Sequence, residues 1–203
     1  MTWQTSSSKT KSSTQPANGQ RPSAHATSKD ASSWNSRRVA ISALFCAAAL
    51  VASFIEIPIF PLAPYLKYDP SGVVCLVAGL LFGPAIGACT AVLPWVIRLF
   101  TDPFGAIMAM ACSLAATLPA AFIYRRHHSF KGAVAGLLIA AVVTLAVALL
   151  GNLVITPLYS GMPPETVAAL IVPVLLPFNL LKIAINTALT LAVYKPVSTM
   201  VGQ

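Results

Sequence analysis

The chain has 203 residues, a length typical of one domain or two small ones. Hydrophobic residues make up 57% of it and charged residues only 9%, with a mean hydropathy of +0.78. Soluble domains carry about 25% charged residues, so this composition excludes an ordinary soluble globular protein. The net charge is +8, and basic residues outside residues 1–36 lie mostly at the ends of apolar segments, which favours a role in membrane topology over nucleic-acid binding.

Residues 1–36 differ from the rest of the chain. They contain ten Ser and five Thr but no Ile, Leu, Val or Phe, so they cannot bury enough apolar surface to order themselves. They also lack the apolar core of a secretory signal. The sequence predicts a disordered, Ser/Thr-rich tail over 1–36, a membrane domain over 37–197 and a short C-terminal tail over 198–203.

The apolar runs are long enough for membrane-spanning helices, which need roughly 20 residues. A polar, proline-containing loop at 61–72 separates the first run from the second. The runs cover 39–59, 73–100, 104–124, 133–157 and 167–194. The second run is interrupted by Gly83-Pro84, a pair well suited to ending a helix, so it is either one span or two.

Charge placement decides between five and six spans. Basic residues flank the runs at Arg37, Arg38, Arg125, Arg126 and Lys195, and cytoplasmic loops are enriched in such residues. With a turn at Gly83-Pro84, all of them lie on one side of the membrane. We therefore expect an all-α membrane protein of six transmembrane helices, two of them short, with both termini in the cytoplasm.

Enzyme and metal motifs are missing from the sequence. It contains no GxxxxGK[ST] loop and no HExxH, and its histidines fall in the tail and in one basic loop. The four cysteines lie in apolar runs without a CxxC pair, so we expect small apolar packing rather than a disulfide or a metal site. The sequence predicts no enzyme, no catalytic residue and no metal.

Three ionisable residues fall inside or at the ends of spans, where they are costly unless paired or hydrated. Arg98 can snorkel to the surface or pair with Asp102, four residues further on. Glu56 is either an interfacial carboxylate or part of a site. Lys182 is harder to explain by interhelical hydrogen bonding alone, because Asn179 precedes it by three residues on the same helical face.

Further polar residues, on the same face and on the fifth span, predict a polar pocket. Asn186 lies four residues after Lys182, and Asn152 lies inside the fifth span. The topology places Glu56, Asn152, Asn179 and Lys182 in the outer half of the membrane, where one pocket could gather them and pair Glu56 with Lys182. The loop 65–69 would cover this pocket, Tyr159 would contribute from the last loop, and a neutral ligand would fit such a charge-balanced site.

The first span carries small residues four apart, Ala43 and Ala47, which let helices approach closely in lipid. Alanine is common in spans, so this spacing alone is a weak signal.

Four stretches, together with the Asn-containing end of the fifth span, resemble the substrate-binding S components of energy-coupling factor (ECF) vitamin transporters, most closely their riboflavin branch. They are EIPIFP at 56–61, LKYDPSGV at 66–73, LLFGPAIG at 80–87 and PFNLLK at 177–182. The riboflavin branch usually has KYDFSD where this chain has KYDPSG, and a lysine followed by asparagine where Arg98-Leu99 stands. An S component for pantothenate or pyridoxine therefore stays open, as does a membrane scaffold without a small ligand.

The resemblance implies a protein of the prokaryotic plasma membrane that uses no cofactor. It would capture a vitamin from outside, with riboflavin as the first candidate, for uptake driven by a transmembrane T component and two cytoplasmic ATPases. Ala43 and Ala47 would face the T component. The implied ligand contacts are Glu56, Asn152, Asn179 and Lys182, mainly to ribityl hydroxyls and the ring edge, with a lid formed by Leu66, Lys67, Tyr68 and Asp69.

Overall fold

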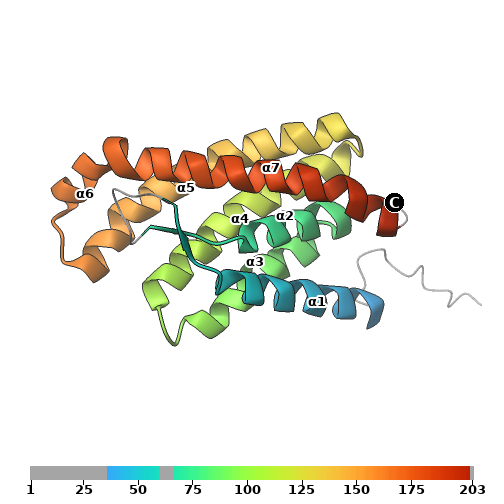
Figure 1. Cartoon of the computed structure of the whole chain (residues 1–203), viewed down its shortest axis with the longest axis horizontal. Helices are drawn as coiled ribbons and strands as arrows, with labels where there is room; N and C mark the ends of the chain where they lie inside the picture. The colour runs from blue at the N-terminus through green and yellow to red at the C-terminus, as the bar shows by residue number, and fades with distance from the viewer. Residues whose placement is uncertain (1–35, 60–65, 202–203) are drawn as a thin grey trace, which may run out of the picture. The chain divides into compact units, whose positions relative to one another are not determined.

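A computed structural model describes residues 36–59 and 66–201, without the side chains of residues 159 and 197–201. The predicted N-terminal tail therefore lies outside the described residues, apart from Ser36. Residues 198–201 of the predicted C-terminal tail form the end of α7. The described part is almost entirely helical (Figure 1). The helices are α1 (Ser36–Ser53), α2 (Ser71–Phe82), α3 (Pro84–Arg98), α4 (Pro103–Arg126), α5 (Phe130–Ser160), α6 (Pro164–Leu170), the π-helix η1 (Ile171–Leu175) and α7 (Leu176–Val201).

Four helical segments are long and apolar enough to cross a membrane, as judged over the described part of the chain. They are Ser36–Ser53, Pro103–Arg126, Phe130–Leu158 and Pro164–Pro196, the last of which joins α6, η1 and α7. The last three match the predicted runs at 104–124, 133–157 and 167–194. The shorter α2 and α3 are also apolar. The protein is therefore a helical membrane protein.

The Gly83-Pro84 pair separates α2 from α3, as the sequence predicts. Gly83 has φ +91°, a conformation that side-chain-bearing residues rarely adopt, and Pro84 opens α3 at a position where its missing N–H is not needed. The two short helices pack against each other.

The first span is shorter than predicted, because α1 ends at Ser53 and not near residue 59. The chain then forms a two-residue strand, β1 (Ile57–Pro58), antiparallel to β2 (Lys67–Tyr68), with Ile57 opposite Tyr68. Pro58 disfavours helical conformation in the residue before it, and the charged Glu56 lies next to that residue. The predicted boundary was wrong because hydropathy alone does not register this proline.

Helix α2 lies at the centre of the bundle and contacts α1, α3, α4 and α7. Its approach to α3 and α4 is close: a Cβ added at Gly87 would lie 2.7 Å from the Cα of Gly79 and 2.7 Å from the Thr117 methyl group. Glycine at both positions lets the α2 and α3 backbones touch. Nine of the twelve α2 residues are buried, whereas Leu44, Val142 and Val172 of other helices are more than 60% exposed, as expected for residues that face lipid.

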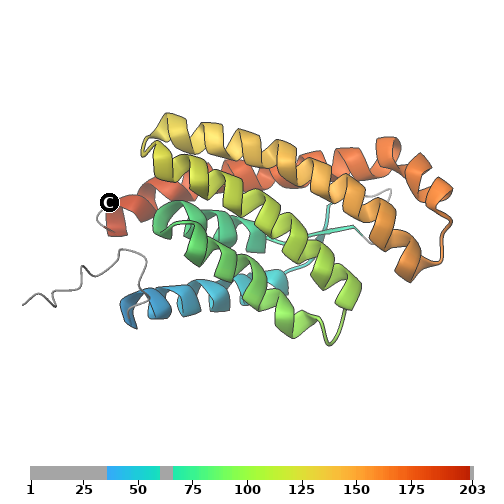
Figure 2. The same ribbon diagram turned by 180° about the vertical axis from the view of Figure 1, so that it is seen from behind.

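The basic residues that flank the predicted spans lie at one end of the helices. Figures 1 and 2 show the start of α1, the α4–α5 connection and the end of α7 at that end, and the β1–β2 hairpin and α6 at the other. At the basic end the buried hydroxyls of Tyr124 and Tyr194 form a hydrogen bond, and the His128 ring packs edge-on against Tyr124. This arrangement agrees with basic loops on a single side of the membrane.

Candidate ligand-binding site

A cavity of about 510 Å³ is lined in part by β2 and α6, elements that lie at the other end of the helices from the start of α1 (Figure 1). Its volume falls in the range of about 300–1,000 Å³ that is typical of small-molecule sites. The strand β2, the segment after α1 and the helices α2 to α7 with η1 all contribute to its wall. The polar and aromatic lining includes Glu56, Lys67, Asp69, Trp95, Arg98, Asp102, Ser113, Asn152, Thr156, Phe178, Asn179, Lys182 and Asn186.

The structure brings most of the predicted site residues to this one cavity. Those that line it are Glu56, Leu66, Lys67, Asp69, Asn152, Asn179 and Lys182. Tyr68 is buried and does not line the cavity among the described residues. The side chain of Tyr159 lies outside what the structure describes.

Glu56 lies at the rim, where two cations hold it. Its carboxylate accepts from Lys67 Nζ at 2.7 Å and from Arg98 Nη2 at 2.6 Å. The hydrogen bond from Lys67, which has the larger effect, and the one from Arg98 hold the pKa of Glu56 below its usual range. The predicted Arg98–Asp102 pair does not form, because the Asp102 side chain accepts from the backbone N–H of Gly105 and caps α4.

Arg98 also ties α3 to the end of α1. Its Nη1 donates to the carbonyl oxygen of Ser53 at 2.6 Å, a carbonyl left without a helical partner where α1 stops. The guanidinium lies 5.4 Å from the Phe54 ring centroid and 5.5 Å from that of Trp95, within cation–π range. Arg98 is therefore bound in place rather than snorkelling freely.

Lys182 pairs with Asp69, and the predicted Glu56–Lys182 pair is wrong. Lys182 Nζ lies 2.9 Å from Asp69 Oδ2, with both side chains mostly buried. The other carboxylate oxygen of Asp69 accepts from the backbone N–H of Ser71 at 3.2 Å and from the Ser71 hydroxyl. Asp69 thus joins α7 to the start of α2.

The two asparagines use part of their amides within their own helices. Asn152 donates to the Ala148 carbonyl oxygen at 2.7 Å and accepts from the Thr156 hydroxyl at 3.1 Å. Asn179 donates to the Leu175 carbonyl oxygen at 2.7 Å. An asparagine amide has two N–H groups, so each side chain keeps one that no described residue accepts.

The charges along the cavity balance. Among the described lining residues, three carboxylates (Glu56, Asp69, Asp102) face three cations (Lys67, Arg98, Lys182). An ionic ligand would add an unbalanced charge to the cavity, whereas a neutral ligand with hydrogen-bonding groups would not. The arrangement can bind a neutral, polar, partly aromatic molecule.

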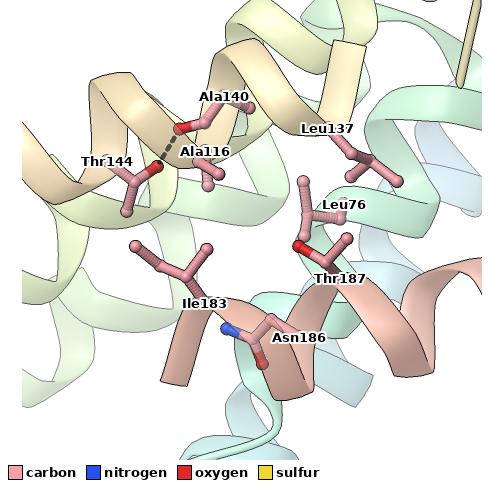
Figure 3. A pocket seen from close by; sticks show the side chains of 9 residues that line it. Leu76, Ala116, Leu137, Ala140, Thr144, Ile183, Asn186 and Thr187 are labelled. Carbon is pink, nitrogen blue, oxygen red and sulfur yellow. Dashed lines mark hydrogen bonds between the residues drawn. The ribbon is translucent and has the colours of Figure 1, made fainter. Parts of the chain in front are cut away.

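A small chamber of about 30 Å³ adjoins the main cavity, because Ala116, Thr144, Ile183 and Asn186 line both. Figure 3 shows the residues of the chamber. The Thr144 hydroxyl donates to the Ala140 carbonyl oxygen at 2.7 Å. The chamber is wide enough for one or two water molecules or a small group of a ligand.

Sequence reasoning did not place several lining residues at the site. Asn186 was on the predicted polar face but was not among the named ligand contacts. Trp95 and Phe178 carry no signal that separates a lining aromatic residue from a core one. The indole N–H of Trp95 is buried and has no partner among the described residues.

Known proteins share this fold and sequence pattern. The family described as the ECF transporter, substrate-specific component, matches residues 37–194. The riboflavin transporter RibU of Staphylococcus aureus (strain TCH60) is 33% identical over 79% of this chain and 89% of its own length. The riboflavin transporter FmnP of Bacillus subtilis (strain 168) is 27% identical over 72% of this chain and 84% of its own length.

A solved structure agrees with these relatives. The S component of a bacterial ECF transporter superposes with a TM-score of 0.71 at 27% identity, over 82% of this chain and 98% of that chain. The family match covers nearly all of the described helices. The chain therefore belongs to the family of substrate-specific components of ECF transporters.

Proposed function

We propose that this chain binds riboflavin in the 510 Å³ cavity and presents it for import. The observation that carries this proposal is a charge-balanced cavity of ligand size in a chain whose relatives are named riboflavin transporters. Riboflavin is neutral, has a planar ring and carries several hydroxyl groups, so it matches the donors and aromatic side chains along the wall.

The proposed site involves the predicted contacts as donors and acceptors. Asn152, Asn179 and Lys182 would bind ribityl hydroxyls and the ring edge, and Leu66 with Lys67 would cover the rim. Glu56 accepts from two cations, so its role would be to fix them. The proposed contact of Tyr159 rests on its place in the chain near Ser160, which lines the cavity.

We further propose that the cavity faces the outside of a prokaryotic cell. The basic residues that flank the spans lie at the other end of the helices from β2 and α6, which line the cavity. Basic ends remain in the cytoplasm, which supports six spans with both termini inside. Import then requires the T component and two ATPases that the family implies. Ala43 and Ala47 are exposed on α1, which is consistent with a helix face that meets the T component.

The first experiment is a titration of the detergent-purified protein with riboflavin, followed by flavin and tryptophan fluorescence. Trp95 lines the cavity, so a bound flavin would quench its emission. Saturable one-to-one quenching at submicromolar riboflavin is expected. If riboflavin gives no response while pantothenate, pyridoxine, thiamine or biotin raises the Tm, another vitamin is the substrate. If none of them has an effect, the vitamin-binding role is overturned.

A further inference from the structure

Two consecutive residues before α2 bind α7 at positions one turn apart. The Tyr68 hydroxyl donates to Asn186 Oδ1 at 3.0 Å, and Lys182 Nζ donates to Asp69 Oδ2 at 2.9 Å. Residues 182 and 186 are four apart, so their side chains lie on one face of α7. These two contacts, which span 118 and 113 residues of sequence, form a latch between β2 and α7.

The two latch residues that precede α2 are buried. Tyr68 is 5% exposed and Asp69 is 9% exposed. Burial, reinforced by the Asp69 charge, raises the pKa of Tyr68, so its hydroxyl stays protonated and remains a donor at neutral pH. On the α2 side, a Cβ added at Gly72 would lie 2.6 Å from Asn186 Nδ2, so the start of α2 packs directly on this amide.

The Tyr68 contact fixes which end of the Asn186 amide faces the ligand. Its amide oxygen accepts from Tyr68, and in Figure 3 that oxygen is turned away from the chamber. Its amide nitrogen donates to no described residue, and Asn186 lines both the main cavity and the chamber. An asparagine amide can rotate to exchange its oxygen and nitrogen, and the bond from Tyr68 is the hydrogen bond among the described residues that fixes which end faces a ligand.

Asp69 orients the Lys182 ammonium group as Tyr68 orients the Asn186 amide. An ammonium group has three N–H donors, and Asp69 accepts one of them, which leaves two for a ligand. The carboxylate also balances the positive charge, so Lys182 can be held inside the cavity while a neutral ligand binds beside it.

We propose that Tyr68 and Asp69 are positioning residues: they hold the donors of Asn186 and Lys182 toward an acceptor-rich, neutral ligand. This inference rests on the proposed function and deepens it, because it assigns Asn186 as a ligand contact. It also changes the expected role of the strand, since Tyr68 acts through α7 and not as a cover over the ligand.

A double-mutant cycle of Tyr68→Phe and Asn186→Ala tests this role. The riboflavin Kd is measured for the wild type, both single variants and the double variant. Loss of one uncharged hydrogen bond predicts a rise in Kd of about 5-fold for Tyr68→Phe. In the Asn186→Ala background the same substitution should change Kd less than about 2-fold, because the amide it orients is already gone.

Tyr194→Phe is the matched control. It removes one buried tyrosine hydroxyl from the Tyr124–Tyr194 pair, which does not line the cavity. It should lower the Tm without changing the riboflavin Kd. If Tyr194→Phe raises Kd as much as Tyr68→Phe does, the effect is a general loss of stability and the positioning role is overturned.

The remaining outcomes also decide the question. Independent effects of Tyr68→Phe and Asn186→Ala on Kd, or no effect of Tyr68→Phe, would overturn the role of Tyr68. If Tyr68→Phe does not fold, a cycle of Asp69→Asn and Lys182→Gln replaces it. Asp69→Asn should then change the riboflavin Kd much less in the Lys182→Gln background than in the wild type. If the wild type does not bind riboflavin, the proposed function fails, whereas coupling of the ligand-free Tm values in either cycle would still establish the latch.

Discussion

Two of the three carboxylates that line the cavity bind cations from distant segments. Glu56 and Arg98 are 42 residues apart, and Asp69 and Lys182 are 113 apart. The rim pair of Glu56 with Lys67 is partly exposed and is worth only about 0–1 kcal/mol. The more enclosed Asp69–Lys182 pair matters more for position, because either charge left alone in the cavity would be costly.

Asn179→Ala should weaken riboflavin binding about 5- to 10-fold, because it removes a lining amide whose second N–H is available to a ligand. The measurement is a fluorescence titration of the purified variant. Leu180→Ala is the control, since Leu180 is 48% exposed next to it and does not line the cavity. Equal affinities for the wild type and Asn179→Ala would contradict a ligand contact at this residue.

Glu56 should contribute stability above about pH 4.5 and lose it in acid. Its pKa is lowered in the folded protein, so the folded state binds fewer protons than the unfolded state and the ionised carboxylate favours folding. The Tm difference between the wild type and Glu56→Gln should stay constant from about pH 8 to pH 5.5 and shrink below about pH 4.5.

Glu165→Gln serves as the comparison for this pH series, because Glu165 is exposed and no ion pair of the described residues includes it. It should show a smaller Tm difference from the wild type at neutral pH. If the Tm difference between the wild type and Glu56→Gln grows on acidification, the ionised Glu56 carboxylate does not stabilise the folded state and the prediction is wrong.

At the scale of elements, the short helices α2 and α3 differ from the long ones in how they pack. They pair through glycine and bring the cavity residues of α3 next to the end of α1. The segment α6–η1–α7 changes its hydrogen bonding over Ile171–Leu175, where the N–H of Leu176 donates to the carbonyl oxygen of Ile171, five residues before it. Pro173 and Pro177 cannot donate, and this π-helical turn accommodates them within a continuous helix.

Gly87→Ala should destabilise the protein, because the new Cβ would lie 2.7 Å from the Gly79 backbone and cannot be relieved by a side-chain rotation. The expected loss of Tm is on the order of 5 °C. Ala85→Val on the same helix is the control, since Ala85 is exposed and has room for two more carbons. A Gly87→Ala variant as stable as the wild type would contradict the close contact of α2 with α3.

At the scale of the whole molecule, α1 lies at the edge of the bundle. It packs on α2 and α3, while Ala43, Ala47, Leu44 and Val51 are exposed. The same helix ends at the cavity rim, where Arg98 binds its last turn. One helix therefore carries both the proposed partner face and part of the ligand site.

Ala47→Trp should block uptake without changing the riboflavin Kd, because a large side chain on α1 would prevent close approach of the T component. Co-purification with the T component and the two ATPases should fall at least 10-fold. Val142→Trp on α5 is the control, since Val142 is 69% exposed on a different helix. Full assembly of Ala47→Trp would place the partner face elsewhere.

The sequence by itself determined the class of protein, the positions of the last three long helical segments, the break at Gly83-Pro84 and the polar face of α7. These features are local, because hydropathy, proline and glycine chemistry and the spacing along one helix act within a few turns. The tertiary structure decided which charges meet: Glu56 with Arg98 and Lys67, and Asp69 with Lys182. Those pairs depend on how distant segments pack around α2, and no local pattern distinguishes the observed pairing from the Glu56–Lys182 pair that topology alone favoured.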